Sequence, residues 1–314
     1  MNYKILGLCM AAAGLLFVAP AFPQNQGQGQ AIITVLPKND GEIAPNISQQ
    51  DLQSVKVSGK EVKVTKWESL RNPQNQVELV LLIDDSARSS LGRQMQDIEQ
   101  FVRSLPSNIK VGIAYMENGQ AVFDGPLSVD HELVLQSLHL PTNGSGTNAS
   151  PYRCLSDLAK NWPSQDRNSR HEVVMVTDGV DNYQQLSDPD GRYVQAATND
   201  SVRAGLVIYS IYWMDKGRFD STDNGENAGQ NLLTEVAEAT GGKNFWQGMG
   251  NPVSFQPYFE ELKLCLRNQY ELGFSAPSGS KPEVKTLTLK LSAPGADVYV
   301  PQQVVVVPAG STKK

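Results

Sequence analysis

The stretch Val77–Ser90, VELVLLIDDSARSS, carries the clearest structural signal in the sequence. Five apolar residues, 79–83, are followed at once by two carboxylates and a cluster of hydroxyls. A short apolar run bounded by polar residues is typical of a strand buried on both faces of a parallel sheet. Ligands of open α/β sheets bind beyond the carboxyl ends of the strands. The stretch therefore predicts a buried strand that delivers residues 84–89 to a ligand-binding edge.

Strands and helices alternate from residue 77 to residue 268, which predicts a doubly wound, mostly parallel α/β sheet, Rossmann-like in character. The third strand should run antiparallel, because only the tight turn Glu117-Asn118-Gly119 separates it from the second. The polar stretch 214–228 predicts a surface loop. The expected strands are 77–83, 111–116, 120–123, 172–176, 206–213 and 243–246, and the expected helices are 91–105, 130–140, 150–162, 193–204, 231–240 and 255–266.

The segments that flank this domain alternate apolar and polar residues, as β-strands do. We expect an N-terminal β segment at 31–75, with a hairpin of 54–57 and 62–67, and a C-terminal β segment at 269–308. Each has about three strands, which is marginal for independent stability. The sequence therefore predicts that the two segments pack into one small β-sandwich, with 309–314 as a tail.

The first thirty residues have the pattern of an export signal. Lys4 precedes an apolar stretch, and Ala19-Pro20-Ala21 is a small-residue cleavage site. We therefore expect a signal peptide at 1–21, a disordered linker at 22–30, and a secreted or periplasmic protein. The apolar stretch is too short for a comfortable membrane span.

The formal net charge of −6 comes without a block of like charges. This balance argues against nucleic acid and against anionic membrane surfaces as main partners. Cys154 and Cys265 fall on helices expected to cover opposite faces of the sheet, so we predict that no disulfide joins them.

Three predicted loops meet at one edge of the sheet: Asp84–Ser89, Gly144–Asn148 and Thr177–Asp181. Together with the order of strands and helices, they resemble the von Willebrand factor type A (vWA) domain, over 77–268. With the predicted signal peptide, the short β segment at the front and the exit LRNQYELGF at 266–274, the chain is similar to secreted vWA-related proteins of acidobacteria.

The resemblance implies a metal-ion-dependent adhesion site (MIDAS), in which Mg²⁺ or Mn²⁺ binds protein oxygens and an acidic residue of a partner protein completes the coordination. The positions that match are Asp84 and Ser86 of the Asp-x-Ser-x-Ser run, Thr147 of the second loop and Asp178 of the third. Singly, each could be a helix cap or a turn residue. The implied partner-binding face comprises Asp84, Ser86, Arg88, Ser89, Thr147, Asp178 and Asp181.

Arg88 departs from this motif, because it stands where the second serine is expected. A guanidinium has five donors and no acceptor, so it cannot bind a cation. Two unit charges 4 Å apart repel by about 4 kcal/mol at an effective dielectric constant of about 20, and a divalent ion doubles this. Arg88 either turns away from a weakly held metal or replaces the metal as a counter-charge to Asp84 and Asp178. Weak metal binding and no metal are equal alternatives.

No nucleotide-binding glycine motif, P-loop or nucleophile elbow occurs in the sequence. His171 precedes the fourth main strand, so it should lie at the opposite end of the sheet from Ser86. We therefore expect a non-enzymatic protein-binding, adhesion or scaffolding module. The alternatives are a metal-assisted hydrolase that uses Asp84 and Asp178, and a purely structural component of the cell envelope.

Overall fold

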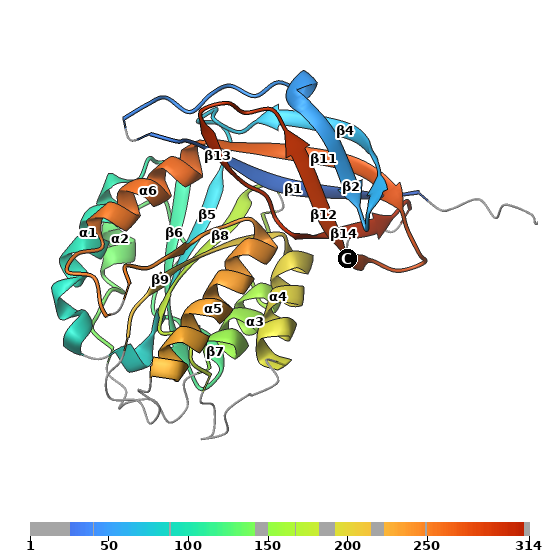
Figure 1. Cartoon of the computed structure of the whole chain (residues 1–314). Coiled ribbons are helices and arrows are strands. Elements are labelled where there is room, and N and C mark those ends of the chain that lie inside the picture. The colour runs from blue at the N-terminus through green and yellow to red at the C-terminus, as the bar shows by residue number, and fades with distance from the viewer. Residues whose placement is uncertain are drawn as a thin grey trace, which may run out of the picture.

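The computed structural model describes residues 26–39, 41–87, 89–141, 150–166, 168–181, 192–214, 223–248 and 250–310, apart from the side chains of Ser86, Ser89, Ser90 and 223–226. The expected signal peptide, 1–21, lies outside these ranges. Figure 1 shows two parts: an α/β part, and an antiparallel sheet across its top. Among the described residues, no helix combines the length and the apolar character that a membrane crossing requires.

The α/β part is built on a six-stranded sheet in the order β10-β9-β8-β5-β6-β7. Counted along this part of the chain, the order is 3-2-1-4-5-6, which is that of a doubly wound sheet. Only β7 runs antiparallel, as predicted, after a turn in which Asn118 and Gly119 have positive φ. The strands are β5 (Val77–Asp84), β6 (Ile109–Glu117), β7 (Gln120–Phe123), β8 (Arg170–Thr177), β9 (Leu206–Tyr212) and β10 (Asn244–Phe245).

Helices cover both faces of this sheet, so β5 is buried over all eight residues. One face packs against α1 (Met95–Ser104) and α6 (Gln256–Arg267), beside α2 (His131–Leu135). The other packs against α3 (Pro151–Lys160), α4 (Arg192–Ala204) and α5 (Asp223–Thr240). Cys265 lies in the first core and Cys154 in the second, and both are free thiols, as predicted.

Helix α5 corrects the loop predicted at 214–228, because it begins at Asp223. Helix propensity did not predict the first part of α5, because this part contains Gly225 and Gly229 and glycine is the weakest helix former after proline. Short 3₁₀ turns complete the part: η2 (Asp85–Ala87) and η3 (Ser89–Arg93) follow β5 directly.

The antiparallel sheet joins the two ends of the chain. Its order is β3-β2-β12-β14-β1-β11-β4, with β13 paired to β1. Its longest pairing brings β1 alongside β11 over nine residue pairs. The elements are β1 (Gln26–Pro37), η1 (Gln49–Asp51), β2 (Leu52–Val57), β3 (Lys60–Glu61), β4 (Lys63–Ser69), β11 (Gln269–Pro277), β12 (Glu283–Leu291), β13 (Ala296–Tyr299) and β14 (Gln303–Pro308).

The predicted sandwich of two sheets is instead one continuous sheet that curls around its own core. The predicted hairpin explains how. The residues just before the predicted second arm, Lys60 and Glu61, pair with β2, and the Val62 amide donates to the Val55 carbonyl (3.0 Å). The rest of that arm then pairs with β11 as β4. A strand that changes partners at a bend is the usual way to turn a corner between two sheet halves.

The linker predicted at 22–30 is wrong from Gln26 onward, because residues 26–30 are the first part of β1. The glycines that suggested flexibility are required by packing. A Cβ on Gly27 would lie 2.7 Å from Ser278 Cβ, and one on Gly29 would lie 2.5 Å from the Phe274 ring. Backbone pairing with β11 does not depend on apolar side chains, so the polar composition gave no strand signal.

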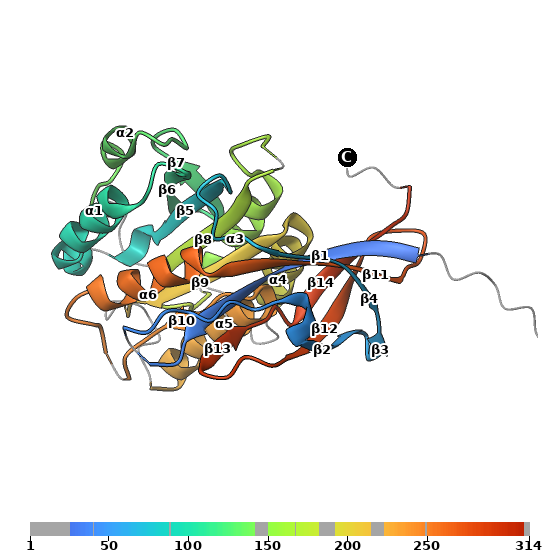
Figure 2. The ribbon, with the colours of Figure 1, turned by 90° about the horizontal axis from the view of Figure 1, so that it is seen from above.

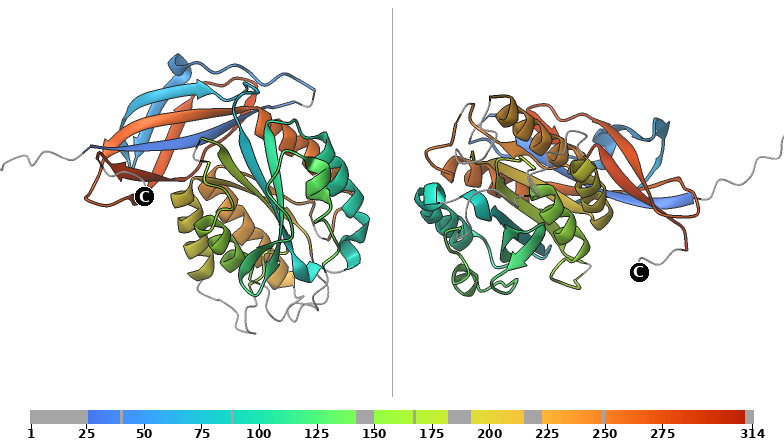
Figure 3. Two further views of the ribbon diagram at one scale, coloured as in Figure 1. Left: turned by 180° about the vertical axis from the view of Figure 1, so that it is seen from behind. Right: turned by 90° about the horizontal axis from the view of Figure 1, so that it is seen from below.

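The antiparallel sheet sits at the amino-terminal edge of the parallel sheet. Only Asn268 separates helix α6 from β11. The side-chain Nε2 of Gln269 donates to Glu172 Oε2 (3.3 Å) and to the Tyr209 hydroxyl (3.2 Å). Seen from above, β1 and β11 extend beyond the α/β part to one side (Figure 2). The carboxyl ends of the parallel strands point to the opposite edge (Figure 3), so the candidate site is far from the antiparallel sheet.

Candidate functional site

The candidate site lies where β5 and β8 end side by side. Their following helices cover opposite faces of the sheet, so this is the topological switch point at which doubly wound sheets bind ligands. Asp84 ends β5 and is 2% exposed. The Thr177 hydroxyl, at the end of β8, donates a 2.7 Å hydrogen bond to Asp84 Oδ2. The two strand ends are therefore joined by a buried polar contact.

Asp178 follows Thr177 and forms a tight turn. Its Oδ1 accepts a 2.9 Å hydrogen bond from the Val180 amide, and Gly179 adopts a φ of +72°. Helix α5 presses directly on this turn, because a Cβ on Gly229 would lie 2.1 Å from the Asp178 carbonyl oxygen. Glycine at 229 thus lets α5 fix the position of the Asp178 carboxylate, which is 5% exposed.

Asp181 is hydrogen-bonded to the start of α3. The Ser150 hydroxyl donates to Asp181 Oδ2 (3.0 Å), and Ser150 also caps the helix by accepting from the Arg153 amide. The buried Tyr152 hydroxyl donates to the Gly179 carbonyl at 2.9 Å. These contacts tie the loop after β8 to the helix that follows the predicted second loop.

The carboxylates of Asp84, Asp178 and Asp181 affect the pKa values of two buried neighbours, Tyr152 and Cys154. Burial raises the pKa of the Tyr152 hydroxyl well above its usual value, and the charges of Asp178 and Asp181 raise it further. Burial likewise raises the pKa of the Cys154 thiol, with Asp84 next in effect. Both groups therefore stay neutral at physiological pH.

Of the predicted site residues, Asp84 lies at the end of β5, Asp178 in the turn after β8, and Asp181 against Ser150 at the start of α3. The backbones of Ser86 and Ser89 lie in η2 and η3, while their side chains, Arg88 and Thr147 lie outside the described residues. Asp85 and Asp181 are buried, at 3% and 8% exposure.

Sequence reasoning missed Thr177 and Ser150, which hold Asp84 and Asp181 in place. The only available signal was their position: Thr177 ends a strand, and Ser150 precedes Pro151 at a helix start.

The donor chemistry suits a hard divalent cation, since Mg²⁺ and Mn²⁺ prefer carboxylate and hydroxyl oxygens. In the described part of the chain, no three His, Cys, Asp or Glu side chains are placed to hold a metal ion together. The predicted set needs only two carboxylates, from Asp84 and Asp178, and takes its hydroxyls from Ser86 and Thr147. The described residues therefore fit the cation in donor type and supply the carboxylate half of the set.

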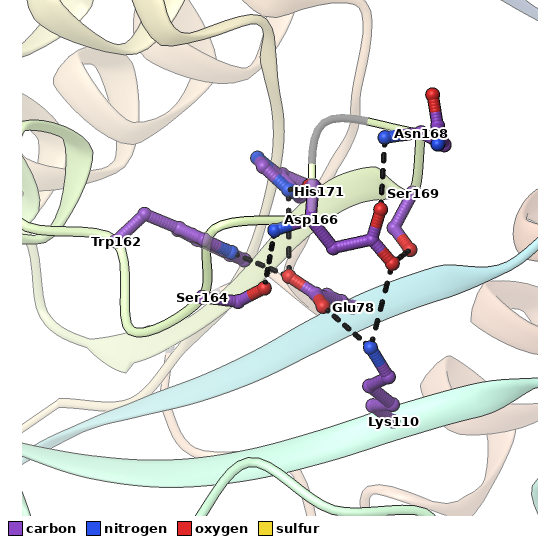
Figure 4. A network of polar contacts seen from close by, with 8 residues as sticks. All are labelled: Glu78, Lys110, Trp162, Ser164, Asp166, Asn168, Ser169 and His171. Atoms are coloured by element: carbon purple, nitrogen blue, oxygen red, sulfur yellow. Dashed lines mark hydrogen bonds and ion pairs between the residues drawn. The ribbon is translucent and has the colours of Figure 1, made fainter.

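The opposite edge of the sheet holds a separate polar network (Figure 4). Glu78, at the start of β5, is fully buried and accepts from Lys110 Nζ (3.0 Å) and Trp162 Nε1 (2.8 Å). His171 Nε2 lies 3.4 Å from the same carboxylate. His171 pairs in register with Glu78, six residues before Asp84. His171 is therefore remote from the candidate site, as predicted. Its role in the network around Glu78 is structural.

We expect Glu78→Gln to lower the free energy of unfolding by about 2 kcal/mol, because charge-assisted hydrogen bonds are worth about 1.5–3 kcal/mol each and the amide places an NH₂ group among donors. Urea denaturation measures the change. Glu61→Gln, at a glutamate that is 64% exposed, is the matched control and should change stability by less than about 0.5 kcal/mol. Equal effects of both substitutions would contradict this role for Glu78.

No family model matches the chain, and no curated protein matches it. Among solved structures, it is similar to an aerotolerance-related membrane protein of Bacteroides fragilis (16% identity, 60% of this chain and 98% of that chain, TM-score 0.42). It is also similar to the conserved hypothetical protein BatB of Bacteroides thetaiotaomicron (16%, 61% and 99%, 0.42). A third is proximal thread matrix protein 1 of the mussel byssus, described with a zinc-occupied MIDAS motif (12%, 68% and 50%, 0.44).

At this level of similarity, these structures do not define the fold class of the protein. The class is therefore taken from the topology of the chain itself. The strand order, the antiparallel β7 and the buried carboxylates where β5 and β8 end define a doubly wound α/β module with one antiparallel edge strand, joined to a curled antiparallel sheet.

Proposed function

We propose that the carboxyl edge of the parallel sheet binds a protein partner, and that the protein is an exported, non-enzymatic adhesion or scaffolding module. The observation that carries the proposal is the junction of β5 and β8, where the Thr177 hydroxyl holds Asp84 beside the turn that presents Asp178. A buried pair of carboxylates at a topological switch point is suited to a cation, either a metal ion or a guanidinium.

Two forms of this site follow from Arg88. In the first, Mg²⁺ or Mn²⁺ is held weakly by Asp84, Ser86, Thr147 and Asp178, and an acidic residue of the partner completes its coordination. In the second, the Arg88 guanidinium is the counter-charge of Asp84 and Asp178, and no metal is bound. Both forms use the same two carboxylates, so the partner-binding proposal does not depend on which one holds.

The position of His171 limits which residues a hydrolase could use here. His171 lies at the amino-terminal edge of the sheet, with its ring stacked on Trp162 and its Nε2 near Glu78. General acid–base catalysis needs the proton donor within hydrogen-bonding reach of the reacting group. His171 is therefore out of reach of Asp84 and Asp178, so the alternative, a metal-assisted hydrolase, would have to use those two carboxylates without it.

Affinity capture from the envelope of the native organism tests the proposal. The immobilised protein should retain a partner that the double variant Asp84→Asn, Asp178→Asn loses, because the amides keep the shape and remove the charge. If a metal bridges the partner, EDTA should abolish retention by the unaltered protein. Glu68→Gln, on the antiparallel sheet and 54% exposed, is the control. Full retention by the folded double variant would contradict binding through this face and support a purely structural role.

A further inference from the structure

His139 lies between α2 and the predicted second loop of the site, and its orientation is fixed by β6. Its ring stacks on Tyr115, with ring centroids 4.1 Å apart and an interplanar angle of 14°. The buried Tyr115 hydroxyl donates to the His139 carbonyl (2.7 Å) and accepts from the His139 amide (2.8 Å). Burial raises the pKa of Tyr115 to about 12, so this hydroxyl keeps its proton and can make both contacts.

Both ring nitrogens of His139 face hydrogen-bond acceptors. Nε2 lies 2.6 Å from Asp124 Oδ2, and Nδ1 lies 2.9 Å from the Leu140 carbonyl oxygen. A neutral imidazole carries one N–H, so its other nitrogen would place a lone pair against an acceptor. Only the imidazolium can donate to both.

We propose that His139 is a proton-binding clamp: as an imidazolium it joins Asp124, just after β7, to the backbone at Leu140, and it releases one of these contacts when it loses its proton. The proposal does not depend on what the candidate site binds. The ligand of the clamp is the proton. Binding it orders the chain around His139, and this local order weakens as pH rises.

The surroundings of the ring favour the charged form. The Leu140 carbonyl raises the pKa of His139 most, partial burial opposes this, and the charges of Asp124 and Asp85 raise the pKa further. Glu117, at the end of β6, also interacts with His139, and burial together with Asp85 and Asp124 raises the pKa of that carboxyl. The stacked Tyr115 ring adds a favourable cation–π contact. Among the residues that the structure describes, the titratable groups around His139 are thus acids and one neutral tyrosine.

The sign of the pH dependence follows from linkage. Because the folded-state pKa is raised, the stabilisation by the clamp is complete below about pH 6.5, the value of an unperturbed histidine, and is lost as pH rises through the folded-state pKa. The side chains of His139 and Asp124 are 39% and 42% exposed, so solvent screens their interaction. We therefore expect local loosening rather than global unfolding.

The test is an NMR titration of the imidazole signals from about pH 5 to about pH 9. His139 should titrate above the reference value and, below its pKa, show two protonated ring nitrogens. Asp124→Asn should lower that pKa, while Asp297→Asn, an exposed acid of β13, should not. The hydrogen-exchange protection factor of the His139 amide should fall above the measured pKa. A native pKa at or below the reference value, or one that Asp124→Asn leaves unchanged, would overturn the proposal.

Discussion

Replacing Gly229 by alanine is expected to lower the free energy of unfolding by about 2 kcal/mol and to displace the Asp178 turn. The new Cβ would lie 2.1 Å from the Asp178 carbonyl oxygen and 3.2 Å from Val180 Cγ2. Since backbone must move, we place the overpacking cost at about 3 kcal/mol, offset by about 1 kcal/mol of improved helix propensity. Urea denaturation gives the stability, and amide chemical shifts of 177–181 report the displaced turn.

Gly92→Ala is the matched control, because among the described residues a Cβ there would meet only Leu140 Cδ2, at an ordinary 3.6 Å. Its effect should stay within about 0.5 kcal/mol. If Gly229→Ala were as stable as the unaltered protein and left the shifts of 177–181 unchanged, α5 would not be what fixes Asp178.

Replacing Arg88 by serine is expected to increase the affinity for Mg²⁺ or Mn²⁺ by about tenfold or more. A guanidinium about 4 Å from a divalent ion costs about 2 kcal/mol even in bulk water and more in a buried site, and about 1.4 kcal/mol corresponds to a factor of ten. The substitution also restores the missing hydroxyl ligand of the motif. Calorimetric titration of the two proteins measures the change, and an unchanged affinity would show that Arg88 does not oppose metal binding.

Local patterns predicted the parallel sheet and the part of the site that depends on it. The apolar run 79–83 identified a strand buried on both faces, and the parallel-strand rule then placed Asp84 and Asp178 at one edge. The turn at Asn118 and Gly119 predicted the antiparallel β7. In each case the signal lies within a few residues of the feature it predicts.

What the sequence could not show depends on contacts between distant residues. The Thr177–Asp84 hydrogen bond joins residues 93 positions apart, and β1 pairs with β11 across the whole α/β part. The polar, glycine-containing residues 26–30 become a strand because their backbone pairs with β11, and Gly27 and Gly29 leave room for Ser278 and Phe274. The contact of His139 Nε2 with Asp124 likewise joins residues 15 positions apart.

The central claim is that Asp84 and Asp178 belong to one cation-binding site at the junction of β5 and β8. Calorimetric titration with Mn²⁺ of Arg88→Ser alone and combined with Asp178→Asn tests it directly, with Asp166→Asn at the opposite edge as the matched combination. The single variant and the Asp166 combination should bind equally, and the Asp178 combination should lose about tenfold or more in affinity. Mn²⁺ binding that survives the loss of the Asp178 charge would contradict the account.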